Sequence, residues 1–392
     1  VYRLLILEKS GPAVLLIPEN LFTCETGEEN FKLPRRKTRI ETDRTAAEDK
    51  SRKRISMGRT VFIAGRDILR EGAREPFSEL VKKMRCPLVS APDAKEVFDN
   101  FSPLYRGTIG VMGNPSAHEA VKRADTVIIA GTDMNETAGY GLRKILSKKN
   151  VLYAGRLPVH LENFTHISRS IMNGIRYLSE NIAADAEDKY GEISYLNSTG
   201  NPYTRIMKII EEDIVSPSII SADAGYSGIY AVHNLKVPEG SSFRISLSTA
   251  GMGYSFGDII GAVVATGRKG YLIAGDGSFF MNGFEIHTAV ELSLPVIFII
   301  FDNSGHRTCS LREKIYFNKI SGSNDFRDIC IGKGFGNIFP TLKTADIRTP
   351  EELEYILKEN RELASPLLIS IKIDNEEIPP YLPLINKRSY NE

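Results

Sequence analysis

The stretch LIAGDGSFFMNGFEIHTAVELSLPVIFIIFDNSGH, residues 272–306, decides the fold. It holds two apolar runs, within 270–278 and 295–303, and a segment with helical spacing, 284–292, between them. A strand, a helix and a second strand in this order favour a right-handed crossover between parallel strands. Polar residues follow each apolar run, Gly-Asp-Gly-Ser after the first and Asp-Asn-Ser-Gly after the second. If the two strands are neighbours, these residues meet at the carboxyl edge of the sheet, where open parallel sheets bind ligands.

The same alternation of strands and helices extends on both sides of this stretch. Such alternation indicates parallel sheets covered by helices. We therefore predict an α/β fold with two doubly wound parallel-sheet domains and the remnant of a third. The predicted strands of the first domain are 59–65, 87–92, 125–133 and 150–156, and those of the second are 218–225, 243–249, 270–278, 295–303 and 366–374. The predicted helices are 74–86, 117–124, 203–214, 257–267, 284–292 and 350–363.

Composition changes along the chain predict four segments. Residues 1–30 are too few to bury a core and resemble the end of a preceding domain. Residues 31–57 are polar and charge-rich without an apolar period, which is more typical of an exposed linker than of a basic patch for nucleic acid. The two α/β domains then occupy 58–195 and 196–392.

The overall composition excludes several classes of protein. Hydrophobic residues make up 42% of the chain and charged residues 25%, an ordinary globular balance. A net charge of +1 argues against a nucleic-acid binder, and without a run of 18 apolar residues we expect no membrane span. We also expect no signal peptide. The four cysteines lack CxxC spacing, so we predict neither a zinc site nor a disulfide framework, and a cytoplasmic location.

The residues after the two strands suit a magnesium ion and a phosphate. Asp276 is a hard oxygen donor, and the backbone N–H groups of Gly277 and Ser278 at a helix start favour a phosphate. Asn303 follows Asp276 by 27 residues and adds a neutral carbonyl oxygen, while the turn after it adds a backbone carbonyl. Mg²⁺ rarely receives a full protein cage, so two oxygen side chains and a phosphate suit it. Gly-Asp-Gly alone is also compatible with a plain tight turn, and the pairing of the two strand ends is the more specific signal.

This pairing resembles the thiamine diphosphate motif of the acetolactate synthase and pyruvate oxidase-like enzymes. That family usually has Asn-Asn where this chain has Asp302-Asn303, and its metal ligand is the second of the two. The resemblance covers nearly the whole chain and implies thiamine diphosphate and Mg²⁺ as cofactors. It identifies the four segments as the end of a pyrimidine-binding domain, a linker, a central domain and a diphosphate-binding domain.

The resemblance also implies roles for individual residues. Met252, in the segment STAGMGYSFG, would prop the cofactor into its bent form, and its N–H would meet a ring nitrogen. A competing interpretation of Gly251, Gly253 and Gly257 as a dinucleotide loop is weaker, because the isolated acid expected after the next strand lies inside Gly-Asp-Gly-Ser. The implied cofactor contacts are Gly225, Tyr226, Ser227, Ala250, Met252, Asp276, Gly277, Ser278, Asn303 and Gly305, and the implied metal ligands are Asp276, Asn303 and Gly305.

Other residues receive less specific expectations. Glu285 matches a position that is structural in the family, and we expect His287 to be a packed or surface residue. The family places substrate-facing groups where this chain has His306, Arg307, Thr308 and Cys309. A carboxylate is the expected partner of the Arg307 guanidinium, and Cys309 is expected to be inert. The central domain of some relatives binds FAD or ADP, but residues 131–142 do not resemble the FAD-contacting segment of acetolactate synthases and give no basis for predicting FAD.

The predicted function is a thiamine diphosphate- and Mg²⁺-dependent carbon–carbon lyase or ligase that acts on a 2-oxo acid, with acetolactate synthase-like decarboxylation and carboligation. In the family a glutamate on the pyrimidine-binding domain of a neighbouring chain starts the proton relay, and no residue here can be assigned that role. We therefore expect a fragment or one part of a split enzyme, working as a homo-oligomer or with a partner chain that supplies this domain. The alternatives are a simple 2-oxo acid decarboxylase and a non-catalytic cofactor-binding or regulatory subunit.

Overall fold

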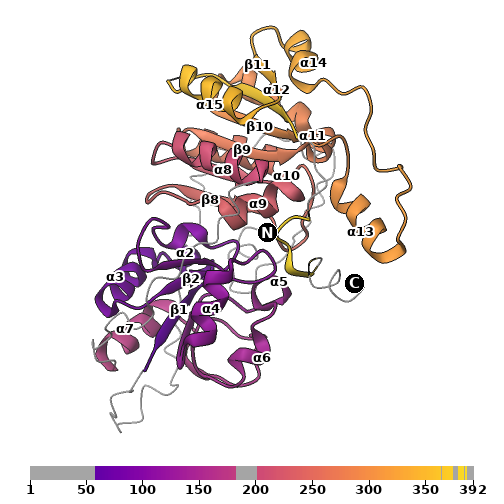
Figure 1. Cartoon of the computed structure of the whole chain (residues 1–392). Coiled ribbons are helices and arrows are strands. Elements are labelled where there is room, and N and C mark those ends of the chain that lie inside the picture. Colours follow the sequence, from indigo (N-terminus) through magenta and orange to yellow (C-terminus); the bar gives the residue numbers. More distant parts are fainter. Residues whose placement is uncertain (1–57, 182–200, 363, 374–377, 384, 386–392) are drawn as a thin grey trace, which may run out of the picture. The chain divides into compact units, whose positions relative to one another are not determined.

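The computed structural model describes residues 58–181, 201–362, 364–373, 378–383 and 385. All of them belong to one compact unit, Arg44–Glu392. The predictions for residues 1–57, the remnant and the linker, lie outside the described residues. Two six-stranded sheets make up the fold, and every strand pair in them is parallel. This arrangement confirms the predicted fold class (Figure 1).

The first sheet has the strand order β3-β2-β1-β4-β5-β6. Its strands are β1 (Thr60–Ala64), β2 (Leu88–Ser90), β3 (Tyr105–Thr108), β4 (Thr126–Ala130), β5 (Asn150–Ala154) and β6 (Thr165–Ser168). Its helices are α2 (Asp67–Arg70), α3 (Arg74–Met84), η2 (Lys95–Val97), α4 (Pro115–Arg123), α5 (Glu136–Gly139), α6 (Arg143–Leu146) and α7 (Ile171–Asn181). Along β1, Phe62 and Ala64 pack in one core with residues of α3 and α7, whereas Val61 and Ile63 pack in a second core with α4. Both faces of the strand are therefore buried, which explains its continuous apolar run.

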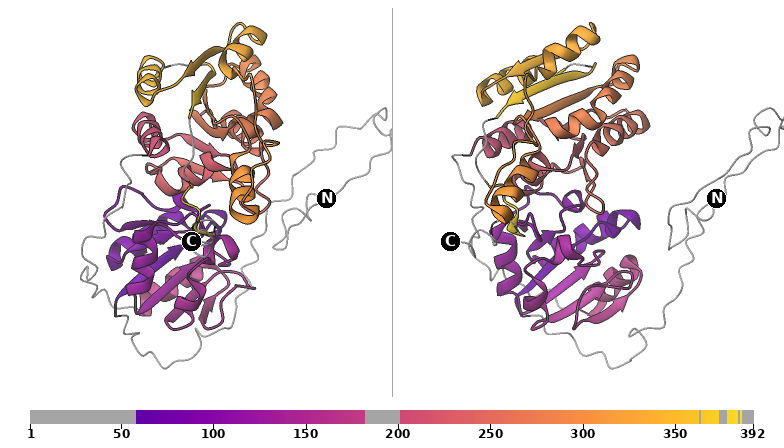
Figure 2. Two further views of the ribbon diagram at one scale, coloured as in Figure 1. Left: turned by 45° about the vertical axis from the view of Figure 1, so that its right-hand side comes forward. Right: turned by 90° about the vertical axis from the view of Figure 1, so that its right-hand side faces the viewer.

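The second sheet has the order β11-β12-β10-β9-β7-β8. Its strands are β7 (Ile219–Ala222), β8 (Ser242–Ile245), β9 (Gly270–Gly275), β10 (Val296–Asp302), β11 (Lys343–Ile347) and β12 (Leu367–Lys372). Its helices are α8 (Pro202–Asp213), α9 (Tyr226–Asn234), α10 (Tyr254–Thr266), α11 (Asp276–Asn282), η3 (Gly283–Glu285), α12 (Ile286–Glu291), α13 (Arg307–Phe317), α14 (Ile331–Ile338) and α15 (Pro350–Glu359). Figure 2 shows both sheets from two further directions.

Helices cover both faces of the second sheet, and the period of two along its strands explains why. On β10, Phe298 and Ile300 belong to a core shared with α10, α11 and α14, whereas Ile297, Ile299 and Phe301 belong to a core shared with α8, α9 and α15. Successive side chains of a strand point to opposite faces, so a strand buried on both sides needs an unbroken apolar run. β9 and β10 are central strands of this kind. β9 is buried from Gly270 to Ala274, and β10 is buried from Val296 to Asp302.

The register of the central strands positions the polar residues that follow them. β9 and β10 are hydrogen-bonded neighbours, with Gly275 opposite Phe301, as the residues of 272–306 predict. Asp276 and Asp302 therefore lie at the same edge. On the other side of β10, Asp302 is opposite Lys372, the last residue of β12. Three strands thus bring charged or polar side chains to one place.

The sequence pattern missed the edge strands β3, β6 and β11 and shifted some boundaries. β3 and β11 each contain several polar residues and lack the continuous apolar run of central strands. The predicted strand 243–249 ends at Ile245, and the helix predicted from 257 begins at Tyr254, after the left-handed Gly253. None of the helices within the described ranges is long and apolar enough to cross a membrane.

Candidate functional site

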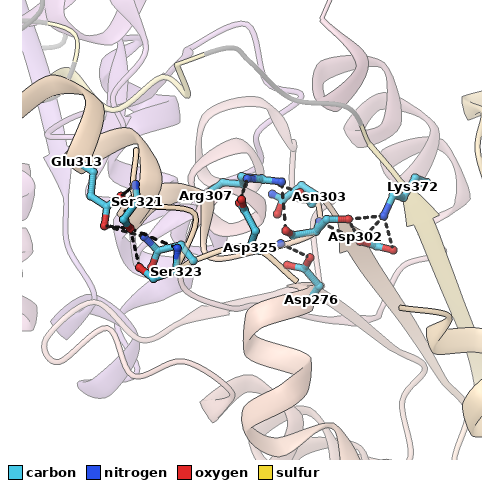
Figure 3. Close-up of polar contacts among 12 residues, drawn as sticks. Asp276, Asp302, Asn303, Arg307, Glu313, Ser321, Ser323, Asp325 and Lys372 are labelled. Carbon is cyan, nitrogen blue, oxygen red and sulfur yellow. Dashed lines mark hydrogen bonds and ion pairs between the residues drawn. The ribbon is translucent and has the colours of Figure 1, made fainter. Parts of the chain in front are cut away.

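Asp276 joins the ends of β9 and β10. It is the first residue of α11 and is 1% exposed. One carboxylate oxygen accepts the N–H of Gly277 at 2.8 Å, and the other accepts the N–H of Gly305 at 2.9 Å. Figure 3 shows this carboxylate close to Asp302 and Asn303. An ionised carboxylate offers about four lone-pair sites, so two remain for a ligand.

Burial changes the acid strength of this carboxyl group. The pKa of Asp276 is raised from 3.8 to about 6, chiefly by burial and in smaller part by the nearby charge of Asp302. The N–H groups of Gly305 and Gly277 and the charge of Lys372 act in the opposite direction. A buried carboxylate that is costly to ionise by itself is stabilised by a bound cation. The electrostatics at Asp276 therefore fit a metal ion.

Asn303 has a buried carbonyl oxygen with unused bonding capacity. The residue is 8% exposed, and its amide nitrogen donates to the hydroxyl of Tyr203 at 3.2 Å. Its side-chain oxygen accepts no hydrogen bond from any described residue. Tyr203 is itself fixed between two parallel rings, with centroid distances of 4.4 Å to Tyr230 and 5.3 Å to Phe301. Since buried polar atoms in proteins are nearly always paired, this oriented oxygen fits a ligand such as a metal ion.

Gly305 completes the turn after β10. Its φ is 151°, and a Cβ added there would lie 2.3 Å from the carbonyl oxygen of Asn324. Gly305 forms an isolated antiparallel bridge with Asp325, and its own carbonyl accepts the N–H of Arg307 at 2.9 Å. A carbonyl oxygen has a second lone pair, so the predicted role as a backbone metal ligand is compatible with this bond.

The guanidinium of Arg307 binds groups in and near the turn after β10 and does not extend into solvent. Its guanidinium donates to the carbonyls of Asn303 at 2.7 Å and Ser304 at 3.1 Å, and to the carboxylate of Asp325 at 2.6 Å. The carboxylate that Arg307 meets in this structure is therefore one of its own chain (Figure 3). His306 precedes it, with its ring 4.8 Å from that of Phe326.

The remaining predicted site residues of this segment lie on α13. Thr308 is half-buried and Cys309 is exposed, both in the first turn of the helix. Their substrate-facing role stays a prediction. Of the two residues singled out after Gly-Asp-Gly-Ser, Glu285 is exposed, and His287 lies on the surface as expected, 3.2 Å from Glu291 and stacked on Phe339.

The sequence analysis missed Asp223, a buried carboxylate that ties the loops of the site together. It follows β7 and is 1% exposed. One oxygen accepts the N–H groups of Ala224 at 2.8 Å and Gly253 at 3.0 Å and the hydroxyl of Ser278 at 2.6 Å. The other oxygen accepts the N–H of Ser255 at 3.0 Å. Ala224 before α9 and the first turns of α10 and α11 are thus all hydrogen-bonded to one carboxylate. The only sequence signal was an acidic residue at the end of an apolar strand.

The start of α9 suits an anion. Gly225, with φ 99°, caps this nine-residue helix, and no atom lies within 4 Å of a Cβ added to it. Ser227 is 1% exposed, and its hydroxyl is without a hydrogen-bond partner in the part of the chain that the structure describes. That hydroxyl lies 3.9 Å from the Cβ position of Gly275, at the end of β9. A helix N-terminus with a free buried hydroxyl is a favourable setting for a phosphate. Tyr226 is buried beside them.

The segment 250–253 lies above the Gly-Asp-Gly turn. Ala250 has a left-handed φ of 49°, and Gly253 one of 82°. The methyl group of Met252 is 3.0 Å from the Cβ position of Gly277, and the Met252 side chain is still 38% exposed. A Cβ on Gly277 would also lie 2.6 Å from the ring of His306. A side chain at 277 would therefore have to displace the His306 ring and the end of the Met252 side chain, and glycine lets both approach the turn.

The site offers oxygen ligands but no protein cage. Among the described residues, no group of three or more His, Cys, Asp or Glu could hold a metal ion. The candidate ligands at this edge are the carboxylate of Asp276, the amide oxygen of Asn303 and the backbone carbonyl of Gly305, next to a helix N-terminus. Hard oxygen ligands in this number, completed by phosphate oxygens and water, suit Mg²⁺.

Comparison with known proteins shows two matches to family models. Residues 52–177 match the model described as "Thiamine pyrophosphate enzyme, central domain". Residues 223–371 match the model described as "Thiamine pyrophosphate enzyme, C-terminal TPP binding domain". The second match includes every predicted cofactor-binding residue, from Gly225 to Gly305.

Curated relatives are similar at low identity. A probable acetolactate synthase large subunit of Methanococcus aeolicus is 24% identical over 84% of this chain and 61% of its own length. A probable pyruvate decarboxylase of Schizosaccharomyces pombe is 23% identical over 81% of this chain and 58% of its own. A 3D-(3,5/4)-trihydroxycyclohexane-1,2-dione hydrolase of Shouchella clausii is 23% identical over 93% and 65%. The chain thus spans about three fifths of the length of these relatives.

Proposed function

Because the chain belongs to the thiamine pyrophosphate enzymes, we propose that its second sheet binds thiamine diphosphate and Mg²⁺ at the edge formed by β9 and β10. The carboxylate of Asp276, the side-chain oxygen of Asn303 and the carbonyl of Gly305 would be the metal ligands. The observation that carries this proposal is the side-chain oxygen of Asn303, which is buried and oriented by Tyr203 but accepts no hydrogen bond from any described residue.

The diphosphate would lie between the metal and the start of α9. The N–H groups at the beginning of this helix, after Gly225, and the hydroxyl of Ser227 are the donors, and the helix end adds a partial positive charge. Gly277 allows the chain to pass close to the ligand. The Ser278 hydroxyl already donates to Asp223, so its role would be to hold the turn while its backbone faces the phosphate.

The organic part of the cofactor would rest on the segment 250–252. Met252 lies against Gly277 and leaves more than a third of its side chain exposed, so it offers an apolar support above the metal turn. The carbonyl of Ala250 and the N–H of Met252 are proposed to face the pyrimidine ring. When bound, thiamine diphosphate supplies the electron sink that the decarboxylation of a 2-oxo acid requires. The residues of this chain anchor and orient it.

We place the substrate among the 2-oxo acids, with decarboxylation and carboligation of the acetolactate synthase type as the reaction. The similarity to an acetolactate synthase subunit and to a pyruvate decarboxylase supports this class but does not distinguish the two reactions. His306 and Thr308 are the proposed substrate-facing groups, since they follow the metal turn at the start of α13.

A further protein surface is proposed to complete the site. Large apolar residues that follow the segment 250–252 and the Gly-Asp-Gly turn in the sequence are exposed: Tyr254 and Phe280 at 54% and Phe284 at 65%. Exposed apolar groups around a cofactor site are typical of a surface that another domain covers. We propose a pyrimidine-binding domain of a second copy or of a partner chain there, which would also contribute the glutamate of the proton relay.

Calorimetric titration of thiamine diphosphate into the full chain, with and without MgCl₂, tests the cofactor site. We expect binding heat that requires Mg²⁺ and is lost in Asp276→Ala and Asn303→Ala. Glu285→Ala, which removes an exposed acid just after the same motif, is the matched control and should bind like wild type. Equal heats for wild type and Asp276→Ala would refute the site. Product analysis after addition of pyruvate and a partner chain then separates acetolactate from acetaldehyde.

A further inference from the structure

Asp302 is a second buried carboxylate at the proposed metal site, and the site does not need it as a ligand. It ends β10, one position before Asn303, and its side chain is 7% exposed. Asp276 lies at the end of the adjacent strand. A buried carboxylate is stable only with a partner of opposite charge or with several hydrogen bonds. The partner decides what Asp302 can do at this edge.

Lys372 is that partner. It ends β12 and lies opposite Asp302 in the sheet register. Its ammonium group is 3.0 Å from one oxygen of Asp302 and 3.1 Å from the other, so it covers the whole carboxylate. The Lys372 side chain is itself 46% exposed. The ion pair therefore neutralises a buried charge with a lysine that water can still reach (Figure 3).

The pair also holds the turn that carries the proposed ligands. The N–H of Ser304 donates to Asp302 at 3.0 Å, and the ammonium of Lys372 contacts the Ser304 hydroxyl as well. Ser304 has a left-handed φ of 57°, a conformation that costs energy in a residue other than glycine. At the far end of the turn, Gly305 is held by Asp276. Asn303 lies between these two points of attachment.

We propose that Lys372 is a positioning residue for the metal-binding turn, which it holds by neutralising Asp302. The pair also keeps Asp302 from replacing Asn303 as a ligand, because both oxygens of Asp302 face Lys372. Asp302 and Lys372 form one unit in this account: without Lys372, an unpaired carboxylate next to Asn303 would compete for the cation and release the turn. The inference rests on the proposed function of this edge as an Mg²⁺–thiamine diphosphate site.

A double-mutant cycle in the full chain tests the inference. Half-saturating Mg²⁺ is measured by calorimetry at a fixed thiamine diphosphate concentration for wild type, Lys372→Met, Asp302→Asn and the double variant. Removal of a residue that orients a metal ligand typically weakens metal binding about tenfold or more, and we expect this for Lys372→Met. Asp302→Asn keeps an acceptor for Ser304 and leaves no unpaired carboxylate beside Asn303, so it should weaken Mg²⁺ binding less than Lys372→Met does. The double variant should recover most of the affinity.

Lys358→Met is the matched control, because Lys358 pairs with Glu354 on the exposed side of α15. It should bind Mg²⁺ like wild type. If Lys372→Met binds Mg²⁺ as tightly as Lys358→Met does, the inference is overturned. A double variant as weak as Lys372→Met would also overturn it, since Lys372 would then act on the ligand directly.

Hydrogen exchange without ligand separates this inference from the function it rests on. The peptide that contains residues 302–306 should exchange faster in Lys372→Met and at the wild-type rate in the double variant. Unchanged exchange in Lys372→Met refutes the positioning role, whatever the chain binds. If wild type binds no Mg²⁺ and thiamine diphosphate while the exchange pattern holds, the proposed function fails and the role of Lys372 in the turn stands.

Discussion

Replacement of Asp223 by asparagine tests how the loops of the site are held. The carboxylate accepts four hydrogen bonds, from Ala224, Gly253, Ser255 and Ser278. An asparagine has only one oxygen, so its NH₂ group must face at least one of these donors. Asp223 is only 1% exposed, so water cannot replace the lost acceptor.

The magnitude follows from these contacts. One buried donor without a partner costs about 1–3 kcal/mol, and each remaining bond loses about 1 kcal/mol when its acceptor is no longer charged. The easier burial of a neutral amide offsets part of this cost. We expect Asp223→Asn to lower the free energy of unfolding by about 3 kcal/mol, which corresponds to a fall of about 6–12 °C in Tm for a domain of this size.

Thermal unfolding followed by circular dichroism measures this change, and Asp213→Asn is the matched control. Asp213 is 7% exposed in the same sheet domain, and its carboxylate accepts the hydroxyl of Tyr271. Its replacement should change the unfolding free energy by less than about 1 kcal/mol. Hydrogen exchange of residues 250–255 should rise in Asp223→Asn and not in Asp213→Asn. An Asp223→Asn protein that melts like the control would refute the argument.

Two further predictions concern the metal turn. The pKa of Asp276 is raised to about 6, and a metal ligand must lose its proton before it binds. The affinity for Mg²⁺ should therefore be constant above about pH 7 and fall about tenfold per pH unit below 6. Calorimetry in a constant ionic medium measures this profile, and an affinity that does not change from pH 5 to 7 would contradict the prediction. The free energy of unfolding of the metal-free chain depends on pH in the opposite direction. The raised pKa of Asp276 in the folded chain stabilises the fold at low pH, and this contribution is lost as the pH rises through about 6. Gly305→Ala should abolish Mg²⁺-dependent binding, because the added Cβ would lie 2.3 Å from the Asn324 carbonyl oxygen. The control Gly267→Ala, at a left-handed position with free space around it, should bind like wild type. Equal binding by the two variants would show that the turn can rearrange.

The fold was largely predictable because its signals are local. The apolar runs within 270–278 and 295–303 have the length and content of strands buried on both faces, and the helix between them makes their parallel pairing the expected topology. The meeting of Asp276 with the residues after β10 followed from that pairing. The edge strand β11 was not predictable in this way, because its sequence KTADI has no apolar run.

The contacts that hold the site were less predictable, because they join segments far apart in the chain. Asp223 binds Ser278, 55 residues away, and Lys372 binds Asp302 across 70 residues. Neither pairing follows from a local pattern, since both depend on the strand order β12-β10-β9-β7. Arg307 was predicted to face the substrate, and its ion pair with Asp325 of the same chain could not be predicted, because it depends on how the segment after α13 returns to the turn.

The most direct test of the central claim is a crystal structure of the full chain grown with thiamine diphosphate and Mn²⁺ in place of Mg²⁺. The anomalous signal of Mn²⁺ locates the ion independently of the protein density. We predict one peak at the carboxyl edge of β9 and β10, with the Asp276 carboxylate, the Asn303 side-chain oxygen and the Gly305 carbonyl each about 2.0–2.3 Å from it, distances typical of hard oxygen ligands, and with diphosphate oxygens completing the sphere beside the start of α9. A peak elsewhere, or a bound diphosphate whose metal does not touch Asp276 and Asn303, would contradict the account.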